Sequence, residues 1–489
     1  MLVSLYTSRV VLNVLGVDDF GTYNVVGGVV TMFGFLNGAM ASATQRFLSF
    51  ELGRNDFVQL RKTFNAAQIV HIGIALLVFV LAETIGLWFL NNYLNIPSGR
   101  MEAARWIYHF SVLSFMITII QVPYNAVIIA RERMNVYAYV SILEVFLKLL
   151  VVFMLSWISF DKLKLYGILL FVVSFIVASI YRIYTLRQFD ETRFEIVRER
   201  KIYKTLMSYS GWTLFGATSM VAKGQGVSII LNMFFGTVVN AAQGIANLVY
   251  GSINSFVANF QIASNPQIVK SYASGDKEYM TNLIIRTSKF SFYLLFILTL
   301  PVILEIDYIL KIWLKIVPEY TAVFTVLILI NAWVDSFSGP LITAVNATGR
   351  IKLYQIVVGT VFTLNLPLSY FLFKFGFSPV STFIVNICIT TVVFLIRLLF
   401  TKKQIPEFPA FLFVREIFLR NLPVVFLAGL IPWIIKINMH TGVLRLTLVV
   451  FISICISILS IYFMGLRSNE KQFVKSNVVR IISKVRNGK

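Results

Sequence analysis

Apolar runs of about 20 residues recur from one end of the chain to the other, and they constrain its fold more than any other feature. Each run can cross the roughly 30 Å hydrocarbon core of a bilayer as an α-helix, whereas a barrel strand needs about ten residues of alternating polarity. The chain is 58% hydrophobic and 13% charged, with a mean hydropathy of +0.80, which is outside the range of soluble domains. The sequence therefore predicts an all-α polytopic membrane protein.

About fourteen membrane-spanning helices are predicted from these runs. The first run has only about fifteen residues before Gly16, short of a full span, so we expect a truncated first helix. The predicted spans cover residues 1–15, 22–48, 65–90, 105–129, 137–159, 165–186, 208–235, 238–264, 289–314, 321–346, 353–374, 377–400, 416–436 and 443–465.

Basic residues alternate between the two sides of these spans. With the N-terminus inside, the inner turns and the tail carry 31 of the 43 Lys and Arg residues, and the outer turns carry nine. The positive-inside rule therefore accounts for most of the formal net charge of +21, and no nucleic-acid partner is expected. The polar stretch 187–207 is expected to form an amphipathic helix on the cytoplasmic membrane surface.

An internal repeat divides the chain. The stretch PYNAVIIARERMNVY, residues 123–137, recurs as PLITAVNATGRIKLY, residues 340–354, at an offset of 217 residues. Leu12 falls on Leu231 at an offset of 219, and one residue of slip from that offset places Asp56 on Asp276. Six spans in each repeat would start both lobes on the same side of the membrane, as a parallel repeat. Four identities align without a gap: Pro123 with Pro340, Ala130 with Ala347, Arg133 with Arg350 and Tyr137 with Tyr354.

The repeat and the charge pattern together predict the domain organisation. We expect an N-lobe at 1–186, a cytoplasmic linker at 187–207, a C-lobe at 208–400, a second cytoplasmic linker at 401–415, two further helices in 416–466 and a basic cytoplasmic tail at 467–489.

Two N-terminal stretches, SRVVLNVLGVDDFGTYNVVGG at 8–28 and ASATQRFLSFELGRND at 41–56, resemble the start of bacterial polysaccharide and O-antigen flippases of the multidrug/oligosaccharidyl-lipid/polysaccharide (MOP) superfamily. The resemblance implies a MATE-like fold, with a cavity between the lobes lined chiefly by the first, second, seventh and eighth spans. It also implies transport of undecaprenyl-pyrophosphate-linked oligosaccharide to the outer leaflet of the bacterial cytoplasmic (inner) membrane. The expected partners are this substrate, membrane lipids and other glycan-assembly proteins. The protein is expected to be a monomer and to need no cofactor.

Charged residues inside the predicted spans are candidates for function, because insertion of a charge costs at least about 2.5–3.5 kcal/mol. Arg9 and Lys223 lie on equivalent spans of the two lobes. Cations facing a cavity from both sides would suit a pyrophosphate, which Arg binds bidentately and Lys binds as a point charge. Alternatively, each cation snorkels to a headgroup or pairs with an acid.

Four further intramembrane residues are candidates for ion coupling or charge relay: Glu83, Glu144, Lys148 and Asp335. Glu144 precedes Lys148 by four residues, which equally fits a simple intrahelical ion pair. Asp335 has no cation within a helical turn and could exchange a proton, although a hydrogen-bonded structural role fits as well. Glu83 lies near the outer end of the third span.

One face of the eighth span is polar. Its side chains recur at helical spacing, so they must face protein or water instead of lipid. Gln45 lies on a comparable face of the second span, which is rich in small residues. Both faces could contact sugars, or they could hydrogen-bond neighbouring helices. The polar residues of the eighth span are Gln243, Asn247, Tyr250, Asn254 and Gln261.

Other activities have weaker support. GWTLFGAT, residues 211–218, has the glycine spacing of a phosphate loop, but Ala217 occupies the Lys position. No catalytic or metal motif is found, and Cys388 and Cys455 lie inside apolar spans. An ion-coupled multidrug (MATE-type) antiporter remains an alternative, although its cavity should be acidic. A membrane glycan polymerase would need a large outer loop for its chemistry, and the longest outer turn predicted here has only about 20 residues.

Overall fold

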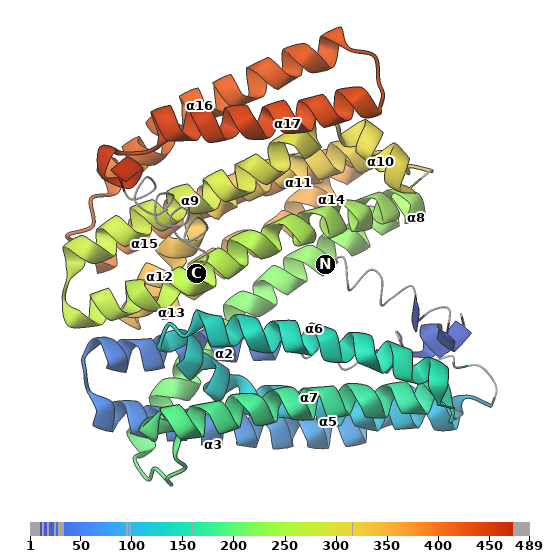
Figure 1. Cartoon of the computed structure of the whole chain (residues 1–489), viewed down its shortest axis with the longest axis vertical. Coiled ribbons are helices and arrows are strands. Elements are labelled where there is room, and N and C mark those ends of the chain that lie inside the picture. Colours follow the sequence, from blue (N-terminus) through green and yellow to red (C-terminus); the bar gives the residue numbers. More distant parts are fainter. Residues whose placement is uncertain are drawn as a thin grey trace, which may run out of the picture. The chain divides into compact units, whose positions relative to one another are not determined.

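The computed structural model describes residues 10–11, 14–16, 19–23, 26–27, 34–93, 96, 99–158, 160–314 and 316–472. These residues are almost entirely helical, and no β-strand occurs among them (Figure 1). The prediction of an all-α fold is therefore confirmed.

The helices follow one another with short connections. They are α2 (Gly34–Gly53), α3 (Phe57–Leu81), the π-helix η1 (Ala82–Gly86), α4 (Leu87–Tyr93), α5 (Met101–Ala130), α6 (Met134–Trp157), α7 (Lys162–Gln188), the 3₁₀ turn η2 (Asp190–Thr192), α8 (Arg200–Ser274), α9 (Lys277–Leu304), α10 (Ile306–Leu314), α11 (Thr321–Ser336), α12 (Ser338–Thr348), α13 (Lys352–Thr363), α14 (Asn365–Lys374), α15 (Ser381–Gln404), α16 (Ala410–Asn438), α17 (Val443–Ser460) and the π-helix η3 (Ile461–Gly465).

Ten helices in the described part of the chain are long and apolar enough to cross a membrane. The pair α11 and α12, bent by 42°, makes an eleventh if it is counted as one span. Two more of the fourteen predicted spans correspond to the second half of the 75-residue α8 and to the less apolar α2. The first predicted span falls largely outside the described residues. The chain is thus a multi-pass membrane protein.

The chain divides into two compact units. Unit 1 comprises Met1–Val221, Asn265–Asp276 and Asn346–Gly359, and unit 2 comprises the rest. In unit 1, α5 packs along α7 and also against α2 and α3 (Figure 1). Apolar side chains such as Phe64, Ile107 and Tyr108 are fully buried between these helices. In unit 2, α9 packs against α11, α16 and α17, while α15 packs against α11 and α14.

Ion pairs join the turns at each end of unit 1. At one end, Arg131 pairs with Glu191 at 2.6 Å, and Lys270 pairs with Glu132 at 2.6 Å. At the other end, Arg100 binds Asp19 at 2.5 Å and Asp161 at 2.7 Å. Because the 30-residue α5 begins next to Arg100 and ends next to Arg131, these two clusters mark its opposite ends.

The stretch 187–207 does not form the expected surface helix. After η2, residues 193–199 are not helical, and α8 begins at Arg200. The buried side chain of Asn65 donates to the carbonyl of Arg193 at 3.1 Å and accepts from the backbone N–H of Glu195 at 2.8 Å. These hydrogen bonds hold the segment against α3 in an extended form, which an amphipathic pattern alone cannot reveal.

Two turns of the predicted repeat have matching backbones. Glu132 has φ 59°, and Gly349, its partner at the offset of 217 residues, has φ 77°. Asn55, which directly precedes Asp56, has φ 55°, and Gly275, which directly precedes Asp276, has φ 84°. All four residues stand in the left-handed conformation that commonly ends a helix. This agreement supports the sequence repeat, while the lobe boundaries stay a prediction.

Candidate functional site

Two cations of unit 2 share one aromatic ring. Lys223 Nζ lies 4.6 Å from the centroid of the Phe362 ring, and Arg397 Cζ lies 5.6 Å from it. Lys223 is half-buried on α8, and the Arg397 side chain on α15 is 4% exposed. The face of an aromatic ring attracts a cation without neutralising it. Phe362, which is buried on α13, therefore holds the two positive heads near each other.

A single acid accompanies these cations among the described residues of this cluster. Arg397 Nη1 donates to Asp335 Oδ1 at 2.9 Å, across from α15 to α11. The Asp335 side chain remains 40% exposed, and its carboxylate interacts electrostatically with Lys223 and Tyr250. The two cations and one anion give the cluster a net positive charge.

Close helix packing places Lys223 at this ring. Gly226 lies one turn after Lys223 on α8, and a Cβ atom at Gly226 would come within 2.5 Å of Leu366 Cδ2. The missing side chain lets α8 approach α14 closely. Because Leu366 lies four residues after Phe362, the same approach brings Lys223 to the Phe362 ring.

Three of the residues selected from the sequence thus gather in one cluster: Lys223, Tyr250 and Asp335. Arg397 is not among the site residues predicted from the sequence, because it counts there with the basic residues of the inner turn that follows the span 377–400. The signal was present, because Arg397 is flanked by VVFLI and LLF and lies inside the predicted span 377–400. The importance of Phe362 had no signal in the sequence.

The polar face of α8 is partly used for packing. The buried Gln243 accepts a hydrogen bond from Ser228 at 2.7 Å. Gln261 Nε2 donates to Ser291 Oγ at 3.1 Å and to the Ser336 carbonyl at 3.4 Å. Both ends of the face therefore bind protein, as the packing alternative expects. Between them Asn247 is exposed and Asn254 is half-buried, and sugar binding by any of these residues stays a prediction.

The remaining candidates belong to unit 1. Glu144 and Lys148 form the intrahelical ion pair that their spacing suggests, at 2.6 Å. Glu83, in η1, binds His109 Nδ1 at 2.9 Å. Gln45 is half-buried on α2. Arg9 lies outside the described residues, so its role stays a prediction. No group of three His, Cys, Asp or Glu side chains in the described part of the chain could hold a metal ion.

Comparisons with known proteins agree with the fold. The MatE family model matches residues 1–154. No curated protein sequence matches the chain. Similar solved structures include a MOP superfamily transporter from Pyrococcus furiosus, at 12% identity and a TM-score of 0.69. A multidrug resistance MATE family transporter in an outward-facing conformation matches at 12% identity and a TM-score of 0.70. MATE in the bent conformation matches at 13% identity and a TM-score of 0.71.

Each of these three structures matches 83% of this chain and 92% of its own. At such low identity, the likeness establishes the fold alone. The protein therefore has the fold of the MATE transporters, as the sequence predicted, and its matched family and structural neighbours are transporters of the MATE and MOP groups.

Proposed function

We propose that this protein is a transporter of the flippase type, which moves undecaprenyl-pyrophosphate-linked oligosaccharide across the cytoplasmic membrane of a bacterium by alternating access. The MATE fold and the N-terminal resemblance support this proposal. The observation that carries it is the net positive cluster in unit 2, where Lys223 and Arg397 share the Phe362 ring.

The chemistry of this cluster suits an anionic headgroup. A pyrophosphate offers several oxygen acceptors, and each charge-assisted hydrogen bond to it is worth about 1.5–3 kcal/mol. Asp335 holds one edge of the Arg397 guanidinium, so it orients this cation. Lys223 lies on an aromatic face and forms no close ion pair with a carboxylate of the described residues, so a phosphate can attract its ammonium group.

An ion-coupled multidrug antiporter is the second candidate, because Asp335 is 40% exposed and could bind a cation or a proton. The two candidates differ in the sign of the charge that the site must bind. The Pyrococcus furiosus transporter is described as having a binding pocket of reverse polarity, which suggests a different function for it. By the same reasoning, the basic excess at Lys223 and Arg397 favours an anionic substrate here.

Transport in cells tests this proposal. Expressed at equal membrane levels in a bacterium that lacks its own flippase, Lys223→Ala and Arg9→Ala should leave glycan on its lipid carrier inside the cell. Lys223→Arg and Arg9→Lys keep the charge and should restore part of the surface glycan. A matched control is Lys374→Ala, which removes an exposed cation at the end of α14 and should transport normally.

Two results would contradict the proposal that the protein is a flippase. Full surface glycan in both alanine variants would show that neither cation binds substrate. Resistance to cationic drugs that depends on Asp335, without any export of glycan, would instead support the antiporter.

A further inference from the structure

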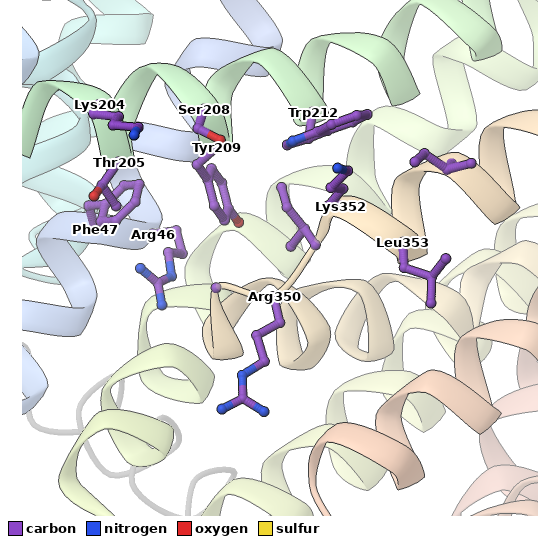
Figure 2. A pocket seen from close by; sticks show the side chains of 13 residues that line it. Arg46, Phe47, Lys204, Thr205, Ser208, Tyr209, Trp212, Arg350, Lys352 and Leu353 are labelled. Atoms are coloured by element: carbon purple, nitrogen blue, oxygen red, sulfur yellow. The ribbon is translucent and has the colours of Figure 1, made fainter.

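A second basic site occurs in unit 1, in a cavity of about 800 Å³. Three elements build it: α2, the first turns of α8 and the segment that leads into α13 (Figure 2). On α8, the lining residues Lys204, Ser208 and Trp212 are spaced by four, so they share one helical face. Their side chains follow one another along the cavity in Figure 2.

The cavity lining is positively charged. Among the thirteen described residues that line it are four cations, Arg46, Lys204, Arg350 and Lys352, and there is no Asp or Glu. The first turn of α13, which begins at Lys352, also lines the cavity, and backbone N–H groups at the start of a helix carry partial positive charge. Such a lining attracts an anion.

Arg46 has a structural role in this site. Its Nη2 donates to the carbonyl of Ala347 at 2.6 Å, and its Nε donates to the carbonyl of Asn346 at 3.1 Å. Both carbonyls belong to the last turn of α12, and the Asn346 carbonyl also accepts from the backbone N–H of Gly349 at 3.1 Å. The buried guanidinium also lies 5.6 Å from the Tyr209 ring. Arg46 thus fixes one wall of the cavity, where its guanidinium group is used in binding protein.

Lys204 and Lys352 are the cations best placed for binding. Lys352 Nζ lies 5.2 Å from the centroid of the Trp212 ring, and Figure 2 shows the two side chains facing each other. Lys204 is exposed on α8, two turns before Trp212. An ammonium group on an aromatic face keeps its charge, so an anion beside Trp212 would meet Lys352 directly.

Apolar side chains adjoin this charge. Leu353, which follows Lys352 directly, lines the cavity and is 55% exposed, and Ile356 lines it one turn further along α13. Trp and Lys at the ends of membrane helices are typical of the headgroup level of a bilayer. A ligand that places an anionic group beside Lys204 and Lys352 and an alkyl chain over Leu353 would match both features.

We propose that this cavity binds the phosphate of a lipid headgroup. The phosphate could belong to a lipid-linked pyrophosphate or to a bulk anionic phospholipid, since both present the same oxygens above an alkyl chain. The inference rests on the cavity in unit 1 and does not depend on the proposed flippase activity.

Thermal stabilisation tests the site directly, because a ligand that binds only the folded protein raises its Tm. The purified protein in neutral detergent is titrated separately with undecaprenyl pyrophosphate, phosphatidylglycerol and inorganic pyrophosphate. We expect the double variant Lys204→Ala/Lys352→Ala to lose about tenfold or more in apparent affinity for each cation removed. Lys204→Arg/Lys352→Arg keeps both charges and should retain most of the binding.

The control removes the same charge beside the cavity. Arg200→Ala/Lys201→Ala neutralises two exposed cations of the first turn of α8 that do not line it, and this variant should bind like the wild type. The Tm of each variant without ligand shows whether the variant folds. If the alanine variant does not fold, the arginine variant still tests the site.

The titrations with the three ligands identify the source of the phosphate. Affinity lost only for undecaprenyl pyrophosphate assigns the site to the lipid-linked compound, and affinity lost for phosphatidylglycerol as well assigns it to phospholipid headgroups in general. An equal loss in the control variant would overturn the proposal, because it would show diffuse surface attraction. Binding of inorganic pyrophosphate as tight as that of the lipids would also overturn it, because the alkyl chain would then contribute nothing.

Discussion

Individual charged residues in this protein are paired across helices that are distant in sequence. Lys289 binds Glu470 at 2.7 Å with both side chains buried, and Arg445 binds Glu305 at 2.8 Å. Removing one member of such a pair would leave a buried charge without its partner, which typically costs about 3–5 kcal/mol. The exposed pairs, in contrast, contribute little, typically below about 1 kcal/mol. Burial therefore decides which charges the fold depends on.

Asp161 is expected to make stability depend on pH. It accepts hydrogen bonds from Arg100 and from the backbone N–H groups of Leu163 and Lys164 at the start of α7. Partial burial acts to raise the pKa of Asp161, but these hydrogen bonds outweigh it and hold the pKa below its ordinary value. A carboxyl group whose pKa is lower in the folded state stabilises above its unfolded pKa, and this contribution disappears as the pH falls through the folded pKa.

We therefore expect Asp161→Asn to lower the free energy of unfolding by about 1–2 kcal/mol near pH 7. The difference from the wild type should shrink as the pH falls below about 4. Thermal unfolding in detergent across this range measures both. Glu102→Gln is the control, because the 76% exposed Glu102 side chain makes only a surface pair with Lys164. A difference for Asp161→Asn that stays constant with pH would contradict the pairing.

Ion pairs between residues that are close in sequence could be predicted. The Glu144–Lys148 pair follows from a spacing of four residues along one helix. The Asp335–Arg397 pair joins α11 to α15 over 62 residues, and no local spacing encodes such a contact. The charges of single spans therefore point to Lys223, Asp335 and Arg397 one by one, but not to the contact between Asp335 and Arg397 or to the role of Phe362.

At the scale of elements, helix ends depend on a few backbone conformations. Gly236 interrupts α8 with φ 78° and ψ −171°, a region essentially restricted to glycine. It lies at the boundary of the two predicted spans 208–235 and 238–264, so hydrophobic patterning placed this break correctly. Patterning failed for 193–199, because there the conformation is fixed by tertiary hydrogen bonds to Asn65.

Gly236→Ala should destabilise unit 2 by about 1–3 kcal/mol through backbone strain. A Cβ atom at Gly236 would have no neighbour within 4 Å, so steric overlap contributes nothing. Gly244→Ala is the matched control, since its Cβ would also have no neighbour and its backbone is helical. That change should be neutral or stabilise by up to about 1 kcal/mol. Equal Tm values for the two variants would show that the break tolerates other residues.

At the scale of the whole molecule, the ion pairs of unit 1 test the alternation of its turns. Every turn that the charge pattern assigns to the inner side and that belongs to this unit is joined to another such turn. Arg61 binds Glu195 at 2.9 Å, Lys270 binds Glu132, and Arg46 binds the end of α12. The outer assignments agree, because Arg100 binds Asp161 at the other end. This assignment of turns to the inner and outer sides could be predicted from the sequence, because it depends only on the number of basic residues between spans.

The orientation of the protein in the membrane can be measured at the two ends of α7. Its 27 residues extend for about 40 Å, enough to cross the bilayer between Asp161 and Glu195. Reporter fusions after Glu195 and after Lys475, in the predicted tail outside the described residues, should give cytoplasmic signals, because basic turns stay inside. A fusion near Asp161 should give an external signal. The opposite pattern at all three positions would invert the topology, and equal signals at Asp161 and Glu195 would show that α7 does not span the membrane.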